Sequence, residues 1–341
     1  MPFNPKIFCC IQKQLNDFEL KKLKIVLLFV LLIQYEIGFS QWVPAGLTGT
    51  SVYALANDGA KIYAGVFASG AYVSADSGSN WSVINSGLPS QLSSFDCFIS
   101  CFTVMDTFMF VGTAGTSGAG VYMSSNGGES WKAVNLGLTH LKVTALASEG
   151  YNLYAGTNGG GVYWSGNKGK NWMAINTGLT NLEISVLEII GSEIVAGTSG
   201  GGVFMSNNRG ASWDAINAGL TNLNIQSLLI FDSLIYVGTH GGGVFKSADH
   251  GNNWKAVNSN LPLNATIYAL CKSDNVILAG LKNHGIYASV DQGTTWSSFN
   301  DGLPNLVFTA MTCNSYFLFA ALDGKGIWKR KLTDLKHMEK N

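Results

Sequence analysis

The chain alternates short apolar segments with turns rich in Gly, Asn and Ser along most of its length. Residues 143–147, 153–157 and 161–165 form one set of three such segments, and only a few polar residues separate them. Apolar segments this short, bounded by turn residues, favour β-strands over helices. Comparable sets start near Val52, Cys101, Val143, Ile184, Ile225, Ile267 and Phe308, so the pattern predicts seven sets of three strands.

A tryptophan motif follows six of these sets. It reads Ser-x-(Asp/Asn)-x-Gly-x-x-Trp, and its tryptophans lie 50, 41, 41, 41 and 42 residues apart, a period typical of propellers and repeat arrays. We expect the Ser and Asx side chains to bond backbone N–H groups of a turn, the Gly to supply a positive φ, and the Trp to bury its ring. The copies are Ser74, Asp76, Gly78 and Trp81; Ser124, Asn126, Gly128 and Trp131; Ser165, Asn167, Gly169 and Trp172; Ser206, Asn208, Gly210 and Trp213; Ser247, Asp249, Gly251 and Trp254; and Ser289, Asp291, Gly293 and Trp296.

This motif resembles the Asp-box, also called the BNR repeat, and the resemblance covers nearly all of the chain after residue 40. It implies a β-propeller of the sialidase, sortilin and photosystem II assembly factor-like superfamily. Each three-strand set and the segment after its Trp make one four-stranded antiparallel blade. The segment 42–47 is a seventh Trp copy at the N-terminal end, so we expect it to complete the last blade after Lys329 and close the ring. The predicted fold is an all-β, seven-bladed propeller over residues 41–331, followed by a short tail, 332–341.

Residues 1–40 have the features of a signal peptide. A basic cluster, Lys21, Lys22 and Lys24, precedes an apolar run at 25–33, and small residues stand at Gly38 and Ser40. The run is well short of the ~20 residues that a spanning helix needs. We therefore expect cleavage after Ser40, no stable membrane span, and a secreted, periplasmic or cell-surface product.

The part after residue 40 contains four cysteines, an even number that permits two disulfide bridges in an oxidising compartment. Cys271 and Cys313 fall near equivalent places in neighbouring repeats, and Cys97 and Cys101 share one insertion. These are the pairings we expect, and the spacing is unlike that of a zinc site.

Charge and arginine content exclude several functions. The 341 residues include 21 acidic and 21 basic side chains, so the net charge is zero and a nucleic-acid partner is not expected. Sialidases of the family hold a carboxylate with three arginines, whereas this chain has only Arg209 and Arg330. Lysine does not reproduce bidentate guanidinium geometry, so we reject sialidase activity. No metal or cofactor is expected.

One carboxylate stands out at the end of the predicted first strands. The equivalent positions are Ala56, Thr103, Ala147, Glu188, Leu229, Cys271 and Thr312. A lone Glu among small and apolar siblings is a candidate for a perturbed pKa and a catalytic role. Xyloglucanase-type relatives use Asp residues in a cleft between two propellers, whereas this chain has a single propeller. The alternative is a solvated strand end.

A second candidate site is a ring of variable residues before the Gly-rich turns. These turns emerge on the face opposite the Trp motifs, and repeat proteins vary their binding face while keeping the framework alike. The ring consists of Phe67, Ala114, Asn158, Ser199, His240, Lys282 and Asp323, with His284 beside it. The alternative is drift among loop residues without a ligand.

Three functions follow from these observations. We favour an exported, monomeric, non-catalytic propeller that binds a protein or a glycan through the ring. A glycoside hydrolase using Glu188 is the alternative, and a structural or assembly-factor propeller is the third possibility.

Overall fold

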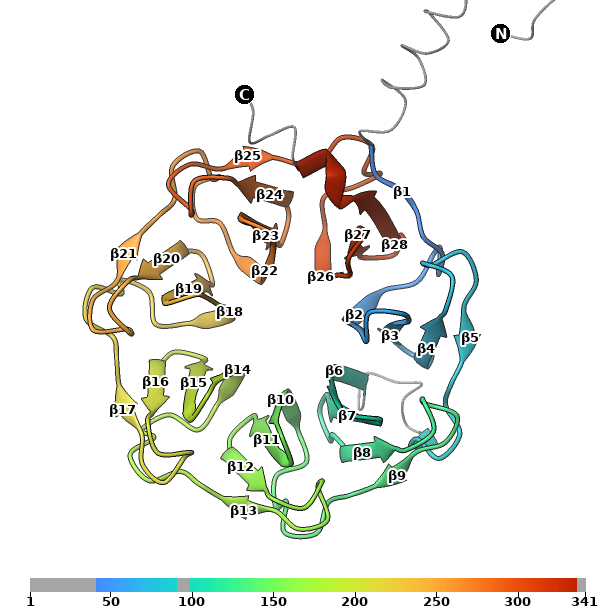
Figure 1. Ribbon diagram of the computed structural model, residues 1–341, viewed down its shortest axis with the longest axis vertical. Helices are drawn as coiled ribbons and strands as arrows, with labels where there is room; N and C mark the ends of the chain where they lie inside the picture. Colours follow the sequence, from blue (N-terminus) through green and yellow to red (C-terminus); the bar gives the residue numbers. More distant parts are fainter. Residues whose placement is uncertain (1–40, 91–97, 336–341) are drawn as a thin grey trace, which may run out of the picture. The chain divides into compact units, whose positions relative to one another are not determined.

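The computed structural model describes residues 41–90 and 98–335, which form seven four-stranded antiparallel sheets arranged around a ring (Figure 1). This confirms the predicted all-β, seven-bladed propeller. The predicted signal peptide, 1–40, lies outside the described residues. Within the described ranges, no helix has the length and apolar character needed to cross a membrane.

The four strands of each blade are ordered from the centre of the ring outward (Figure 1). The inner strands are β2 (Val52–Asn57), β6 (Phe98–Met105), β10 (Val143–Glu149), β14 (Ile184–Ile190), β18 (Ile225–Phe231), β22 (Ile267–Ser273) and β26 (Phe308–Cys313). The second strands are β3 (Ile62–Val66), β7 (Phe108–Ala114), β11 (Asn152–Thr157), β15 (Glu193–Thr198), β19 (Leu234–Thr239), β23 (Val276–Leu281) and β27 (Phe317–Leu322). The third strands are β4 (Gly70–Ser74), β8 (Gly120–Ser124), β12 (Gly161–Ser165), β16 (Gly202–Ser206), β20 (Gly243–Ser247), β24 (Gly285–Ser289) and β28 (Gly326–Lys331). The outer strands are β5 (Ser82–Val83), β9 (Lys132–Ala133), β13 (Met173–Ala174), β17 (Asp214–Ala215), β21 (Lys255–Ala256), β25 (Ser297–Ser298) and β1 (Val43–Pro44).

The N-terminal strand closes the ring as predicted. β1 pairs antiparallel with β28, with Val43 opposite Lys329, so the two ends of the propeller share the last blade. Trp42 Nε1 donates to the Phe299 carbonyl at 2.6 Å, at the edge of the preceding blade. The six motif tryptophans make the same kind of bond, such as Trp131 Nε1 to the Ile84 carbonyl at 2.8 Å. Trp42 therefore acts as the seventh copy of these blade-to-blade contacts.

The inner strands are tied to one another by short polar side chains. Each inner strand has a register shift near its start, as between Val143 and Ala145. The residue between them, Thr144, is therefore unpaired in its own blade. There Thr144 Oγ1 donates to the Ile184 carbonyl of the next blade at 2.5 Å. Equivalent bonds to the next blade, each 2.6 Å long, come from Ser100, Ser185 and Thr309. A Ser or Thr at this position thus joins adjacent blades.

The Trp motifs form turns held by the buried Ser hydroxyl. Ser206 Oγ donates to Asn208 Oδ1 at 2.9 Å and accepts from the Gly210 N–H at 2.7 Å. Gly210 has a φ of 90°, and the preceding Arg209 also has a positive φ, 57°. The sequence did not predict this second left-handed residue, because Arg rarely adopts that conformation and the hydrogen bonds of the turn impose it here.

Replacing Ser206 with Ala should lower the free energy of unfolding by about 1–3 kcal/mol, because the buried Gly210 N–H loses its acceptor. Ser212→Ala is the matched control, since Ser212 lies in the same turn but is exposed, and its hydroxyl accepts a hydrogen bond from Asn208 Nδ2 outside the core. Urea unfolding of both variants checks this. Equal losses would mean that the buried hydroxyl does not stabilise the turn.

The folded part of the chain reaches beyond the predicted boundary at residue 331. Leu332–Asp334 form a short 3-10 helix, and Leu335 is only 2% exposed. Arg330 is buried, lies 3.6 Å from the centre of the Phe299 ring, and pairs with Asp334 at 3.2 Å. Residues 332–335 therefore pack on the last blade, and 336–341 lie outside the described part.

One inner strand begins earlier than predicted, and the expected cysteine pairs lie only partly within the described residues. The second inner strand starts at Phe98 rather than near Cys101, because Ile99 occupies the buried position that Val52 has in the first blade. Cys101, Cys271 and Cys313 are free thiols in this structure. Cys97 lies outside the described residues.

Candidate functional site

The two faces of the ring carry different turns. Because strands alternate in direction, the turns between second and third strands and the connections to the next blade lie on one face, here called the hairpin face. The Trp motifs and the turns between first and second strands lie on the other, the motif face. This is the division that the sequence predicted.

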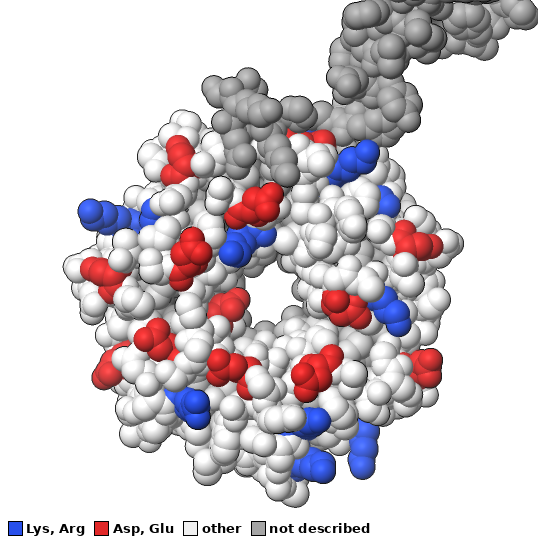
Figure 2. All heavy atoms as spheres, viewed as in Figure 1, with Lys and Arg blue, Asp and Glu red and all other residues white. Residues whose placement is uncertain are grey.

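Acidic residues occupy several of the inner turns on the motif face, where the first strand meets the second. Figure 2 shows one face of the ring, on which Asp and Glu side chains lie around the central opening. Asp106 and Asp232 have φ values of 53° and 54°, so they fill left-handed turn positions that Asp tolerates. No group of three or more His, Cys, Asp or Glu suited to a metal ion occurs within residues 41–90 and 98–335. The turns themselves explain these two carboxylates.

An aromatic group lies at the channel mouth on the hairpin face. Tyr53 is the second residue of β2, Phe67 lies in the β3–β4 turn, and Phe98 begins β6. The Tyr53 ring centre is 5.6 Å from that of Phe67 and 5.5 Å from that of Phe98, and the two Phe rings are 6.4 Å apart. Tyr53 nevertheless remains 39% exposed. Three rings thus meet where two blades join.

Charged side chains extend this group across the neighbouring blades. Lys282 Nζ lies 5.9 Å above the ring of Tyr268, the second residue of β22. In the β27–β28 turn, Asp323 Oδ1 accepts a hydrogen bond from Ser51 Oγ, which fixes the carboxylate beside Tyr53. Burial, the negative charge of Asp323 and the nearby Tyr268 together raise the pKa of the Tyr53 hydroxyl. We call Tyr53, Phe67, Phe98, Tyr268, Lys282 and Asp323 the channel-mouth cluster.

The cluster contains three residues of the predicted ring, Phe67, Lys282 and Asp323. Sequence reasoning missed Tyr53 and Tyr268, although a signal was present. They occupy the position where four other inner strands carry the Ser or Thr that bonds the next blade. A tyrosine cannot make that short bond, so its ring is free to face the channel.

The other members of the predicted ring stay apart from the cluster. The backbone N–H groups of Asn158, Ser199 and His240 each donate to the residue just before the inner strand of their own blade, as in the 2.9 Å bond from the His240 N–H to the Asn224 carbonyl. His284 is exposed. The ring contacts, the Lys282–Tyr268 contact and the Ser51–Asp323 hydrogen bond that define the channel-mouth cluster involve none of these four residues.

Glu188 lies in an apolar seam between two blades. It shares a sheet face with Val186 and with its partner Val195, both of which pack toward β18. Burial raises the pKa of the Glu188 carboxyl to about 7. At the equivalent seam position, Thr103 lies 3.1 Å from Ser148 of the next blade. For Glu188 the corresponding neighbour is Ile230, which offers no hydrogen bond.

The pKa of Glu188 predicts a pH-dependent stability. The folded state holds the proton more tightly than the unfolded chain, whose pKa is near 4.5. The destabilisation of the folded state by the buried Glu188 carboxylate is absent below pH 4.5, grows between pH 4.5 and about 7, and is constant above pH 7. Glu188→Gln removes this destabilisation. The variant should therefore gain about 2–3 kcal/mol more in free energy of unfolding, compared with the unchanged protein, at pH 8 than at pH 4.5. Urea unfolding at both pH values checks this, and an equal effect at the two would contradict it.

Comparisons with known proteins agree with the propeller. Residues 192–317 match the family described as the DUF6242 beta propeller domain. No curated protein matches the chain. Among solved structures, YCF48 bound to D1 peptide is 19% identical with a TM-score of 0.67, covering 86% of this chain and 96% of that one.

Two larger proteins contain a similar propeller. The GH74 xyloglucanase from Xanthomonas campestris is 17% identical with a TM-score of 0.68, covering 86% of this chain and 54% of that one. PorZ, a surface component of the type-IX secretion system of Porphyromonas gingivalis, is 14% identical with a TM-score of 0.63, covering 82% of this chain and 46% of that one. This chain spans about half the length of each. At such identities the likeness concerns the fold, which both binding proteins and a hydrolase share.

Proposed function

We propose that this chain is an exported, monomeric, non-catalytic propeller that binds a segment of a partner protein at the channel-mouth cluster. The observation that carries the proposal is the group of three aromatic rings beside a fixed carboxylate at one mouth of the channel, with Lys282 above the ring of Tyr268 in a nearby blade. Exposed aromatic side chains beside charged groups are typical of the residues that dominate binding energy at interfaces.

The surroundings of the cluster support a polypeptide ligand. Half-exposed leucines lie in the connections on the same face, at Leu141, Leu182, Leu223 and Leu306. This face therefore offers apolar contacts around a small charged centre, the arrangement typical of protein-binding surfaces. The likeness to YCF48 bound to D1 peptide also supports a peptide ligand.

Binding of the purified chain 41–341 to arrays of peptides and of glycans tests the proposal. We expect bound peptides with apolar residues next to a charged one, and loss of these signals in Phe67→Ala. If glycans bind instead, and this binding is lost in Phe67→Ala, the ligand of the channel-mouth cluster is a carbohydrate rather than a protein. Signals that persist in Phe67→Ala would place the ligand elsewhere.

A glycoside hydrolase is the second candidate, because a carboxyl with a pKa near 7 is suited to act as a general acid. Hydrolysis of this kind needs two carboxylates facing one bond, and the neighbours of Glu188 in its seam are apolar. We therefore expect no new reducing ends when chain 41–341 is incubated with a panel of polysaccharides and glycoproteins. Release that disappears in Glu188→Gln would overturn the binding proposal in favour of a glycosidase.

A further inference from the structure

The seam between the sixth and seventh blades places two thiols side by side. In two other seams, a polar residue near the end of one inner strand bonds the residue one position further along in the next blade. Thr103 and Ser148 lie 3.1 Å apart, and Asn57 Nδ2 donates to Thr312 Oγ1 at 2.8 Å. The same register sets Cys271 of β22 against Cys313 of β26.

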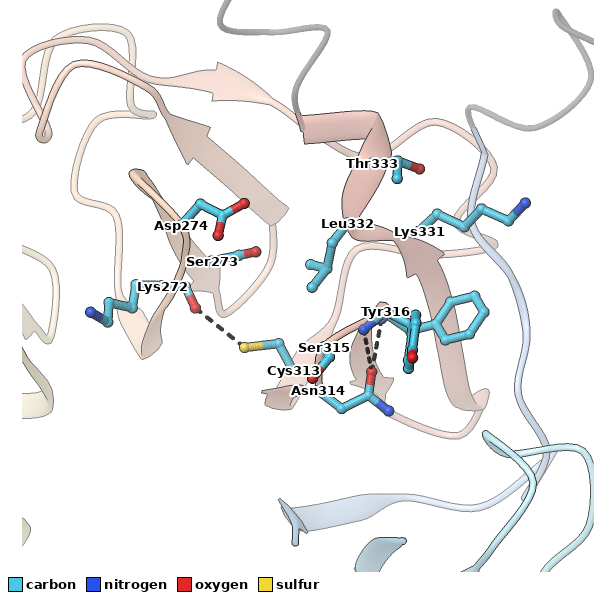
Figure 3. Close-up of a pocket in the computed structure, with 11 residues that line it drawn as sticks. Lys272, Ser273, Asp274, Cys313, Asn314, Ser315, Tyr316, Lys331, Leu332 and Thr333 are labelled. Atoms are coloured by element: carbon cyan, nitrogen blue, oxygen red, sulfur yellow. Dashed lines mark hydrogen bonds between the residues drawn. The ribbon is translucent and has the colours of Figure 1, made fainter. Parts of the chain in front are cut away.

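The hydrogen bonds of the two cysteines follow this pattern. Cys313 Sγ donates to the Lys272 carbonyl at 3.3 Å (Figure 3), just as Ser148 Oγ donates to the Val104 carbonyl at 3.3 Å. The Cys271 thiol in turn donates to the Cys313 sulfur, which lowers the pKa of Cys313 and raises that of Cys271. Cys313 is thus the better nucleophile at neutral pH.

Access to the two sulfurs also differs. Cys313 lines a cavity of about 590 Å³ on the motif face, together with Lys272, Asn314, Tyr316 and Leu332 (Figure 3). Cys271 is not part of this lining. The last blade has the 3-10 helix Leu332–Asp334 where the others have a Trp motif. A small reagent that enters this cavity can therefore reach Cys313, and Cys271 lies across the seam from it.

We propose that Cys271 and Cys313 form a redox modification site, in which Cys313 reacts with a small disulfide such as oxidised glutathione and Cys271 completes an intrachain disulfide. The Cys313 thiolate attacks one sulfur, the reagent's S–S bond breaks, and one thiolate leaves. Cys271 then gives its proton to a thiolate, attacks the Cys313 sulfur, and expels the second thiol. Two protein thiols are oxidised as one disulfide is reduced to two thiols, so the exchange balances.

The product is a covalent link between the sixth blade and the ring-closing seventh blade. It closes a loop from residue 271 to residue 313 and restricts the unfolded chain. We expect the melting temperature of the oxidised protein to rise by roughly 5 °C. The reduced and oxidised forms therefore differ in how firmly the ring is closed.

The test uses the full chain, reduced and then incubated with oxidised glutathione. Remaining thiols are alkylated, and non-reduced tryptic peptides are analysed by mass spectrometry. We expect a peptide pair joining Cys271 to Cys313, reversed by dithiothreitol, and a higher melting temperature. Cys101→Ser is the matched control and should keep the cross-link, because Cys101 lies in another seam and burial raises its pKa to about 12.

Single variants separate the two roles. Cys271→Ser should accumulate a glutathione adduct on Cys313, whereas Cys313→Ser should leave Cys271 unmodified. The proposal is overturned if both thiols of the native chain remain alkylatable, or if a glutathione adduct persists on Cys313 while Cys271 is intact. Circular dichroism of each Ser variant establishes that the propeller is folded before the reaction.

Discussion

Trp42→Ala should lower the free energy of unfolding by about 3–5 kcal/mol, the typical cost of deleting a buried tryptophan side chain. The Trp42 ring is 2% exposed, packs edge-on against Phe299 at 6.1 Å, and bonds the Phe299 carbonyl. The residue also anchors β1, the short strand that completes the last blade. Without this anchor, we expect β28 to present an open edge, which favours aggregation.

Urea unfolding and light scattering measure the two consequences. Val43→Ala is the matched control, because Val43 is in the same strand with an exposed side chain, and it should change stability by at most about 0.5 kcal/mol. If Trp42→Ala cost no more than Val43→Ala, the N-terminal segment would not be the closing element of the ring.

Tyr53→Ala should weaken binding of an array-selected peptide by at least about tenfold, as expected for an aromatic residue at the centre of an interface. Tyr53 contacts both Phe67 and Phe98 and lies beside Asp323, so its removal disrupts contacts in the centre of the channel-mouth cluster. Tyr53→Phe keeps the ring and should retain most of the affinity.

Isothermal titration calorimetry of the three proteins checks this prediction. Tyr151→Ala is the matched control, because Tyr151 is 67% exposed in a turn on the motif face. Equal weakening by Tyr53→Ala and Tyr151→Ala would show that the effect is not specific to the hairpin face.

The blade number and ring closure could be predicted because each rests on local, repeated signals. A Trp motif gives its own turn, and Trp42 was identified as a seventh copy by sequence alone. The signature is strong because each of the six complete motifs meets the same physical requirement, a buried hydroxyl and an indole N–H bonded to the previous blade. Trp42 keeps only the indole bond.

The site was harder to predict because it combines residues from four blades. Phe67, Lys282 and Asp323 stood out as variable turn residues, but their neighbours Tyr53 and Tyr268 project from positions created by register shifts in β2 and β22. A Ser or Thr recurs at this position in four other inner strands, but the contact of Tyr53 with turn residues follows only from the packing of the blades. The surroundings of Glu188 were hidden for a related reason, since its facing residue, Ile230, follows only from the packing of adjacent blades.

The most direct test of the binding site is hydrogen–deuterium exchange of chain 41–341 with and without the strongest array-selected peptide. Binding at the channel-mouth cluster predicts slower exchange in residues 51–53, 67–70 and 323–324, with little change in the Trp-motif turns. Slower exchange confined to the motif face, with no change in those three segments, would contradict the account.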